Sequence, residues 1–167
     1  MKFKSQDSSP LIAVGEHLAI IDKVYLGEAE GNGRYNDKTE QLVVVFMAAK
    51  KLITRWFNLK GYEVDPDEKT IKDDSGRDIP NYLIDKQGNR IEDEKNTEAC
   101  LRIIGQLGCD AGIASDEDFE PSDLEGLEVG ISVIEDSSFG KARLKVAYTL
   151  PAERVSAASE KAEAFAD

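Results

Sequence analysis

The strongest hydrophobic signal in the chain lies at residues 41–59, QLVVVFMAAKKLITRWFNL. Residues 42–46 form an unbroken apolar run that is too short for a typical helix and rich in β-branched and aromatic types, so it predicts a buried strand. Residues 53–59 predict its antiparallel partner, with residues 48–51 as the connection. Side chains alternate across a strand, so the partner turns Ile53, Arg55, Phe57 and Leu59 mainly toward the core. The opposite face carries Thr54, Trp56 and Asn58.

Four further elements follow from the same pattern. A strand is predicted at residues 15–26, and Asp22 interrupts its apolar alternation, which indicates a bulge or bend. A helix at residues 98–107 presents an apolar stripe of Leu101, Ile104 and Leu107. Asn96 or Thr97 is its expected cap and Gly108 its expected end. The last two strands are predicted at residues 127–135 and 141–150.

Three strands, a helix and two strands follow one another in the order of an OB-fold, a five-stranded Greek-key barrel with its helix between strands three and four. We therefore predict a mainly β, OB-like barrel formed by one domain, residues 1–155. Residues 60–95 are acidic and rich in turns, and they are predicted to be an insertion after the third strand, with a turn at residues 73–76 and a small hairpin at residues 81–93. Residues 156–167 predict a flexible acidic tail. An antiparallel α+β sandwich with one helix is the alternative.

Charge is distributed unevenly along the chain. The net charge is −12, but residues 61–139 carry 22 acidic and 7 basic residues, whereas residues 140–155 carry 1 acidic and 4 basic residues. The parts richest in predicted strands are thus mildly basic. An anionic ligand is compatible with these parts despite the overall charge.

The sequence offers few components for catalysis or metal binding. Cys100 and Cys109 would lie about 13 Å apart on one helix, which is too far for a disulfide. His17 is the single histidine and is expected to be an incidental surface residue. Neither a zinc site nor a Cys–His nucleophile pair can be assembled. We expect no cofactor, no metal and no catalytic residue. Without a signal peptide or an apolar run of about 20 residues, we also expect a cytoplasmic protein that does not enter membranes.

In an OB-fold the ligand lies across strands two and three, between the loops that join strands 1–2 and 4–5. Aromatic side chains interleaved with cations at these places are typical of binding to single-stranded nucleic acid, because bases stack on rings and cations meet phosphates. The predicted nucleic-acid-binding residues are Trp56, Tyr35, Arg34, Lys38, Thr54, Asn58, Phe139, Lys141, Arg143 and Lys145.

Four of these residues also have an ordinary structural interpretation. Trp56 could cap the core at one end of the barrel. Tyr35 could belong to a solvated glycine-rich loop. Arg143 and Lys145 could form a plain solvent-facing strand edge.

The layout resembles the OB-fold single-stranded DNA-binding proteins of bacteriophages and prophages. The resemblance covers about residues 11–152. Its features are Gly15-Glu16-His17 before the first strand, Trp56-Phe57-Asn58-Leu59 in the third, Leu107-Gly108 at the helix end, and DLEGLEV at residues 123–129. The acidic insertion departs from that family.

The resemblance implies sequence-independent binding of single-stranded DNA in phage or prophage replication or recombination, in the cytoplasm of a bacterial host. It also implies that Phe165 and Asp167 in the tail contact replication or recombination proteins, and it leaves homo-oligomers open. One rival is a phage structural or assembly protein that uses the same barrel for protein contacts. The other is a small hydrolase using the acidic clusters, although these fall in turns and form no paired framework.

Overall fold

The first strand organises the fold because it pairs with two different neighbours. The computed structural model describes residues 1–3, 12–31, 33–137 and 142–155. Strand β1 (Gly15–Ala29) pairs with β6 (Glu128–Asp136) through its first half and with β2 (Thr39–Ala48) through its second half. The register with β2 shifts between Ile21 and Lys23. This shift confirms the irregularity predicted at Asp22.

The pairing produces one five-stranded antiparallel sheet in the order β3-β2-β1-β6-β7, where β3 is Lys51–Asn58 and β7 is Arg143–Leu150. The mainly β architecture is thus confirmed, and the described residues form one long helix. The closed barrel is not confirmed, because the sheet remains open between β3 and β7. Side chains of these two edge strands line a groove between them, and the sheet hydrogen bonds stop there.

Helix α1 (Glu94–Asp110) is longer than predicted at both ends. Asp93 caps its start by accepting a hydrogen bond from the amide of Asn96, so the expected cap at Asn96 or Thr97 was wrong. Thr97 instead accepts a hydrogen bond from the Gly61 amide. At the other end, buried Asp110 accepts a 2.7 Å hydrogen bond from the Thr149 hydroxyl of β7. The helix is thus tied to the insertion at one end and to the sheet at the other.

The core lies between the inner face of the sheet and α1. On β2 the apolar run is buried as predicted: Leu42, Val44 and Phe46 lie in the core, and Val43 on the other face is covered as well. Ile104 and Leu107 of α1 join them, whereas Leu101 of the predicted stripe is half-exposed. His17 is also inside: it is 8% exposed and donates to the Ala13 carbonyl at 2.6 Å, so its expected surface position was wrong.

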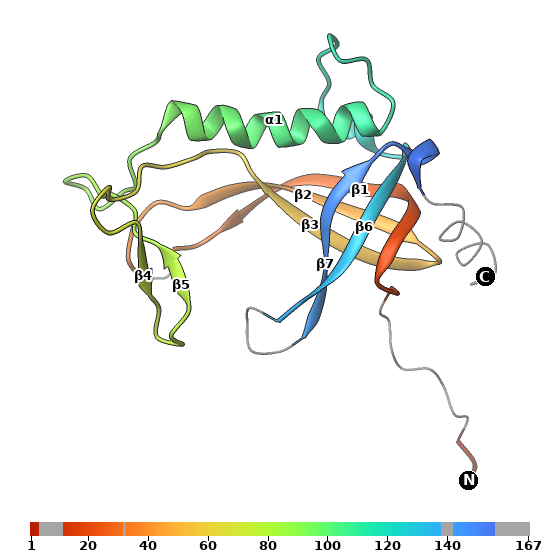
Figure 1. The fold of residues 1–167 in the computed structure, drawn as a ribbon, viewed down its shortest axis with the longest axis horizontal. Helices are drawn as coiled ribbons and strands as arrows, with labels where there is room; N and C mark the ends of the chain where they lie inside the picture. Colours follow the sequence, from red (N-terminus) through yellow and green to blue (C-terminus); the bar gives the residue numbers. More distant parts are fainter. Residues whose placement is uncertain (4–11, 32, 138–141, 156–167) are drawn as a thin grey trace.

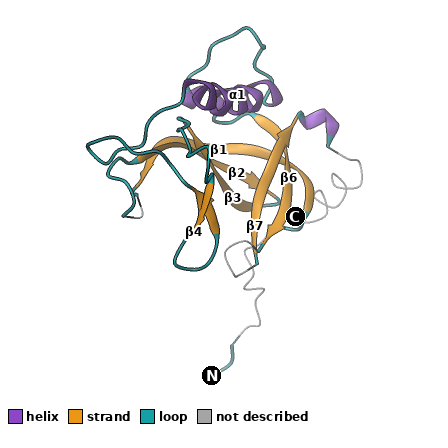
Figure 2. Ribbon diagram, turned by 60° about the vertical axis from the view of Figure 1, so that its left-hand side comes forward, coloured by secondary structure: helices purple, strands orange, loops and turns teal. Residues whose placement is uncertain are grey.

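The insertion is built around a small hairpin of β4 (Thr70–Lys72) and β5 (Asp78–Pro80). Asp73 and Gly76 close its turn, where the sequence predicted a turn. The second hairpin, predicted at residues 81–93, is reduced to isolated bridges such as Ile84 with Arg90. Figures 1 and 2 show α1 on one side of the sheet and the β4–β5 hairpin extending from the other.

The turn between β2 and β3 is the tightest in the sheet. Ala48 pairs with Lys51, so only Ala49 and Lys50 connect the strands, and both have positive φ, at 50° and 62°. Two residues with positive φ match the twist of a two-residue hairpin, but glycine or asparagine usually occupies such positions. This hairpin uses neither.

Gly108 does not end α1 as the sequence predicted. It is buried within the helix, and a Cβ atom there would lie 2.5 Å from the ring of Phe119, which packs against the core. The missing side chain therefore makes room for the loop that returns to β6.

We predict that Gly108→Ala lowers the free energy of unfolding by about 1–2 kcal/mol, because overpacking against Phe119 outweighs the gain in helix propensity. Gly105→Ala is the matched control, since nothing lies within 4 Å of a Cβ atom there. It should stabilise by about 0.5–1 kcal/mol. Urea denaturation of both variants measures the difference. Equal stabilisation of the two would contradict the packing role of Gly108.

Candidate functional site

A groove of about 730 Å³ lies between the two open edges of the sheet. Strand β3 forms one wall and the β6–β7 hairpin the other. We call it the edge groove; its lining residues are Ile53, Thr54, Arg55, Trp56, Ile134, Asp136, Arg143, Leu144, Lys145, Val146 and Ala147. Because it follows strand edges, residues of both alternating sets line it.

Four of the predicted site residues meet in this groove: Thr54, Trp56, Arg143 and Lys145. They come from strands that are separated by nearly ninety residues of sequence. Trp56 is 59% exposed, so it does not cap the core. A large and mostly exposed aromatic ring thus lines the same groove as two cations.

Arg55 adds a third cation that the sequence analysis assigned to the core. Its guanidinium carbon lies 4.4 Å from the centre of the Phe57 ring, and burial lowers the pKa of Arg55. Asp136 is the acidic residue of the lining, 3.5 Å from the Lys145 ammonium. The groove therefore has more basic than acidic groups in a chain whose net charge is −12. The sequence signal that could have identified Arg55 is a charged residue within the otherwise apolar set of alternating positions that includes Phe57.

A second aromatic ring shares the outer face with Trp56. Tyr25 of β1 pairs with Val43 of β2, and Val43 pairs with Trp56 of β3, so the three form one row across the sheet. Tyr25 is 51% exposed, while Val43 between the rings is 2% exposed. With strands about 4.8 Å apart, the two rings stand roughly 10 Å from each other. Tyr25 could have been found by restarting the alternation after the bulge.

The remaining described candidates lie outside the edge groove. Asn58 accepts a hydrogen bond from Gln41 at 3.0 Å, and Lys38 lies 3.7 Å from Glu28. Arg34 and Tyr35 line a different pocket, formed with the insertion. Phe139, Lys141, Phe165 and Asp167 lie outside the described residues.

Tyr35 is held by Arg90, a buried arginine of the insertion. The guanidinium carbon of Arg90 lies 4.0 Å from the ring centre of Tyr35 and 3.8 Å from that of Tyr62. Its side chain is 2% exposed and donates to the Asp37 carboxylate and to the Thr39 hydroxyl. This cluster fastens the insertion to the loop between β1 and β2. The sequence gives little signal of this cluster, because its aromatic residues lie in loops and the arginine is isolated.

Charge pairing sets the protonation of the cluster. Burial alone would raise the pKa of Asp37, but hydrogen bonds from Arg90 and its positive charge outweigh that effect and hold the pKa below its usual value. Burial also opposes the charged form of Arg90, yet its hydrogen bond to Asp37 raises its pKa. The pair is therefore ionised at neutral pH.

When the sequence is compared with known proteins, no family model and no curated protein matches it. In the described part of the chain, no three or more His, Cys, Asp or Glu side chains form a group that could hold a metal ion. No helix of that part is long and apolar enough to cross a membrane. The assignment of function therefore depends on the edge groove itself.

We predict that Arg90→Lys loosens the insertion, because a lysine cannot stack between two rings and bind a carboxylate through two nitrogens at once. The free energy of local opening at residues 61–93 should fall by about 2 kcal/mol or more. Native-state hydrogen exchange measures it, with amides of β2 as an internal reference. Arg77→Lys, which alters the partly exposed pair with Asp73, is the control and should change opening by less than about 1 kcal/mol. Equal effects of the two substitutions would contradict the role of Arg90 in holding the insertion.

The depressed pKa of Asp37 gives a pH prediction with a defined sign. Its stabilising charge is fully present above the pKa of an unfolded aspartate, about 3.9, and is lost as the pH falls through the lower folded value. Wild type should therefore be more stable than Asp37→Asn at about pH 6, and the difference should shrink toward about pH 3. Urea denaturation at both pH values tests this. A pH-independent difference would rule out the ionised pair as its source.

Proposed function

We propose that this protein binds single-stranded DNA without sequence specificity and that the strand lies in the edge groove. The observation that carries the proposal is the position of exposed Trp56 beside Arg55, Arg143 and Lys145 in one groove. Stacking on an aromatic ring contributes about 1–3 kcal/mol per base and tolerates any base. Cations beside the ring would neutralise phosphates and release counterions.

The topology supports an OB-like interpretation. The sheet order is β3-β2-β1-β6-β7, and along the chain α1 lies between β3 and β6, the third and fourth strands of this sheet. This is the order expected for a partly open OB barrel. In such a barrel the edges β3 and β7 approach each other and the outer face of β2 and β3 receives the ligand. Trp56 stands on that face. The proposal extends to a role in phage or prophage replication or recombination, in a bacterial cytoplasm and without catalysis.

A second candidate, a barrel used for protein contacts, is favoured by one observation. Ile20, Met47 and Leu52 lie in register across β1, β2 and β3, and all three are at least 38% exposed. An apolar row of this kind on the outer face is typical of surfaces that contact another protein. A copy of this chain is one such partner, and size-exclusion chromatography would detect the resulting oligomer.

The lone tryptophan provides the test of the DNA-binding proposal. Oligo-dT titrated into the protein at low salt should quench Trp56 fluorescence to saturation, and added salt should reverse the quenching. A flat fluorescence titration together with no gel shift would contradict the proposal. In that case the protein-contact candidate becomes the better account.

We predict that Lys145→Glu weakens oligo-dT binding at low salt and lowers the slope of log affinity against log salt. Each lost phosphate contact removes about 0.7 from that slope on single strands. Arg102→Glu is the matched control: it makes the same charge change at an exposed residue of α1 that does not line the edge groove. Fluorescence titrations at several salt concentrations measure both. If both variants lose affinity equally, the effect is one of net charge and the groove is not the site.

A further inference from the structure

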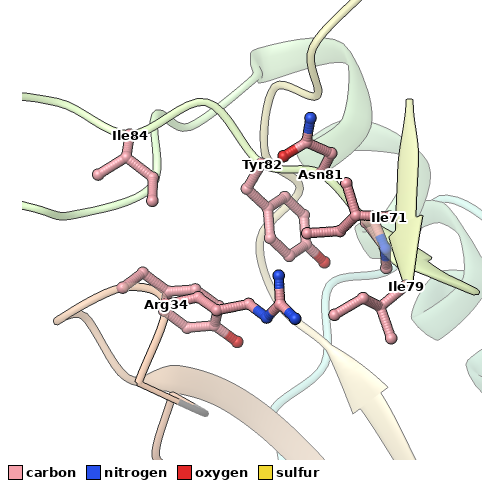
Figure 3. A pocket seen from close by; sticks show the side chains of 8 residues that line it. Arg34, Ile71, Ile79, Asn81, Tyr82 and Ile84 are labelled. Atoms are coloured by element: carbon pink, nitrogen blue, oxygen red, sulfur yellow. The ribbon is translucent and has the colours of Figure 1, made fainter. Parts of the chain in front are cut away.

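A second pocket, of about 310 Å³, lies between the loop after β1 and the β4–β5 hairpin. We call it the hairpin pocket; its lining residues are Arg34, Tyr35, Ile71, Ile79, Pro80, Asn81, Tyr82 and Ile84. Its volume is at the lower end of the range of small-ligand sites, about 300–1,000 Å³. Figure 3 shows the guanidinium of Arg34 reaching in among Tyr82, Ile71 and Ile79.

We propose that the hairpin pocket receives one unstacked base of the DNA strand that occupies the edge groove. This inference rests on the proposed function and extends it to a second subsite. It gives the acidic insertion a direct part in binding. The argument has three steps: the shape and chemistry of the pocket, its charge, and its position.

The lining combines flat apolar walls with a few polar groups. Tyr35 and Tyr82 meet edge to face, with ring centres 5.9 Å apart, and Ile71 and Ile79 pair across the hairpin. Arg34 donates to the Lys72 carbonyl at 3.3 Å, which holds its guanidinium at the pocket. A purely aliphatic side chain in the pocket would desolvate the guanidinium without offering it an acceptor. A base fills a flat slot and presents ring carbonyl oxygens that accept from arginine.

Charge favours a neutral occupant. Residues 65–80 carry six acidic and three basic side chains, so the hairpin beside the pocket is net negative. A free carboxylate or a phosphate would meet that charge, whereas a base is uncharged. The phosphates would then remain near the cations of the edge groove, and only the base would enter the hairpin pocket.

Position links the two sites. Trp56 of the edge groove is two residues from Asn58, where β3 ends and the insertion follows. Gln41 of β2 pairs with both Asn58 and Gly27, so the loop after β1 leaves the sheet at the same end. The two segments that form the walls of the hairpin pocket thus leave the sheet at the same end, which lies two residues beyond Trp56 along β3. The Arg90 cluster fixes them to each other, which would give the base a preformed site.

The test fills the pocket and measures binding against strand length. Fluorescein-labelled oligo-dT of about 4 to about 16 nucleotides spans the site sizes known for single OB-folds. Fluorescence polarisation of these probes is measured with wild type, Ile79→Trp and the control Ser75→Trp. Ser75 lies in the exposed turn of the same hairpin and does not line the pocket. Ile84→Trp, at a lining residue that is 42% exposed, repeats the test should Ile79→Trp fail to fold.

The pocket-filling variants should bind long oligonucleotides at least about fivefold more weakly than wild type. They should bind the shortest ones equally well, and Ser75→Trp should match wild type throughout. Identical length profiles for all proteins would overturn the inference while keeping the proposed function, and would leave the pocket to an apolar peptide side chain. An equal loss with Ser75→Trp would also overturn it. Failure of wild type to bind any probe would remove the proposed function and this inference together.

Discussion

The bulge in β1 is the constraint on which the architecture depends. A regular strand would keep one neighbour on each side along its whole length, and the sheet would stay flat enough for its edges to diverge. Here the register breaks after Ile21, and the Glu125 carboxylate accepts a hydrogen bond from the Val24 amide at 3.1 Å, beside the break. The strand bends, β2 and β3 continue from one half, and β6 and β7 continue from the other. The two free edges consequently face each other across the edge groove.

The same arrangement explains why an acidic protein can present a basic groove. The cations of the groove come from β3 and β7, whereas the acidic residues are concentrated in the insertion and the segment before β6. The buried pair of Arg90 and Asp37 holds the insertion in place, and neither residue lines the edge groove. The edge groove and the attachment of the insertion therefore use different arginines, and each is placed by a different part of the chain.

Much of the fold was predictable because its signals are local. The apolar run of β2, the alternation in β3 that exposes Trp56, and the irregularity at Asp22 all follow from neighbouring residues. The helix boundaries were less accessible: Gly108 looks like a terminator until Phe119, eleven residues later, is found against it. Arg90 was missed for the same reason, since its partners Tyr35 and Asp37 lie more than fifty residues earlier. Thr54, Trp56, Arg143 and Lys145 line one groove because the strand order places β3 and β7 at the two facing edges of the sheet.

The turn at Ala49 and Lys50 has a consequence for how the chain folds. A left-handed backbone conformation costs a residue other than glycine roughly 1 kcal/mol or more, and this turn contains two such residues in succession. Such a turn opposes hairpin closure, whereas an Asn-Gly turn would promote it. The pairing of β2 with β3 must therefore be driven by the side chains of the strands, Phe46 and Phe57 among them. We expect the hairpin to form only as the core collapses around it, so that the wall carrying Trp56 is completed late in folding.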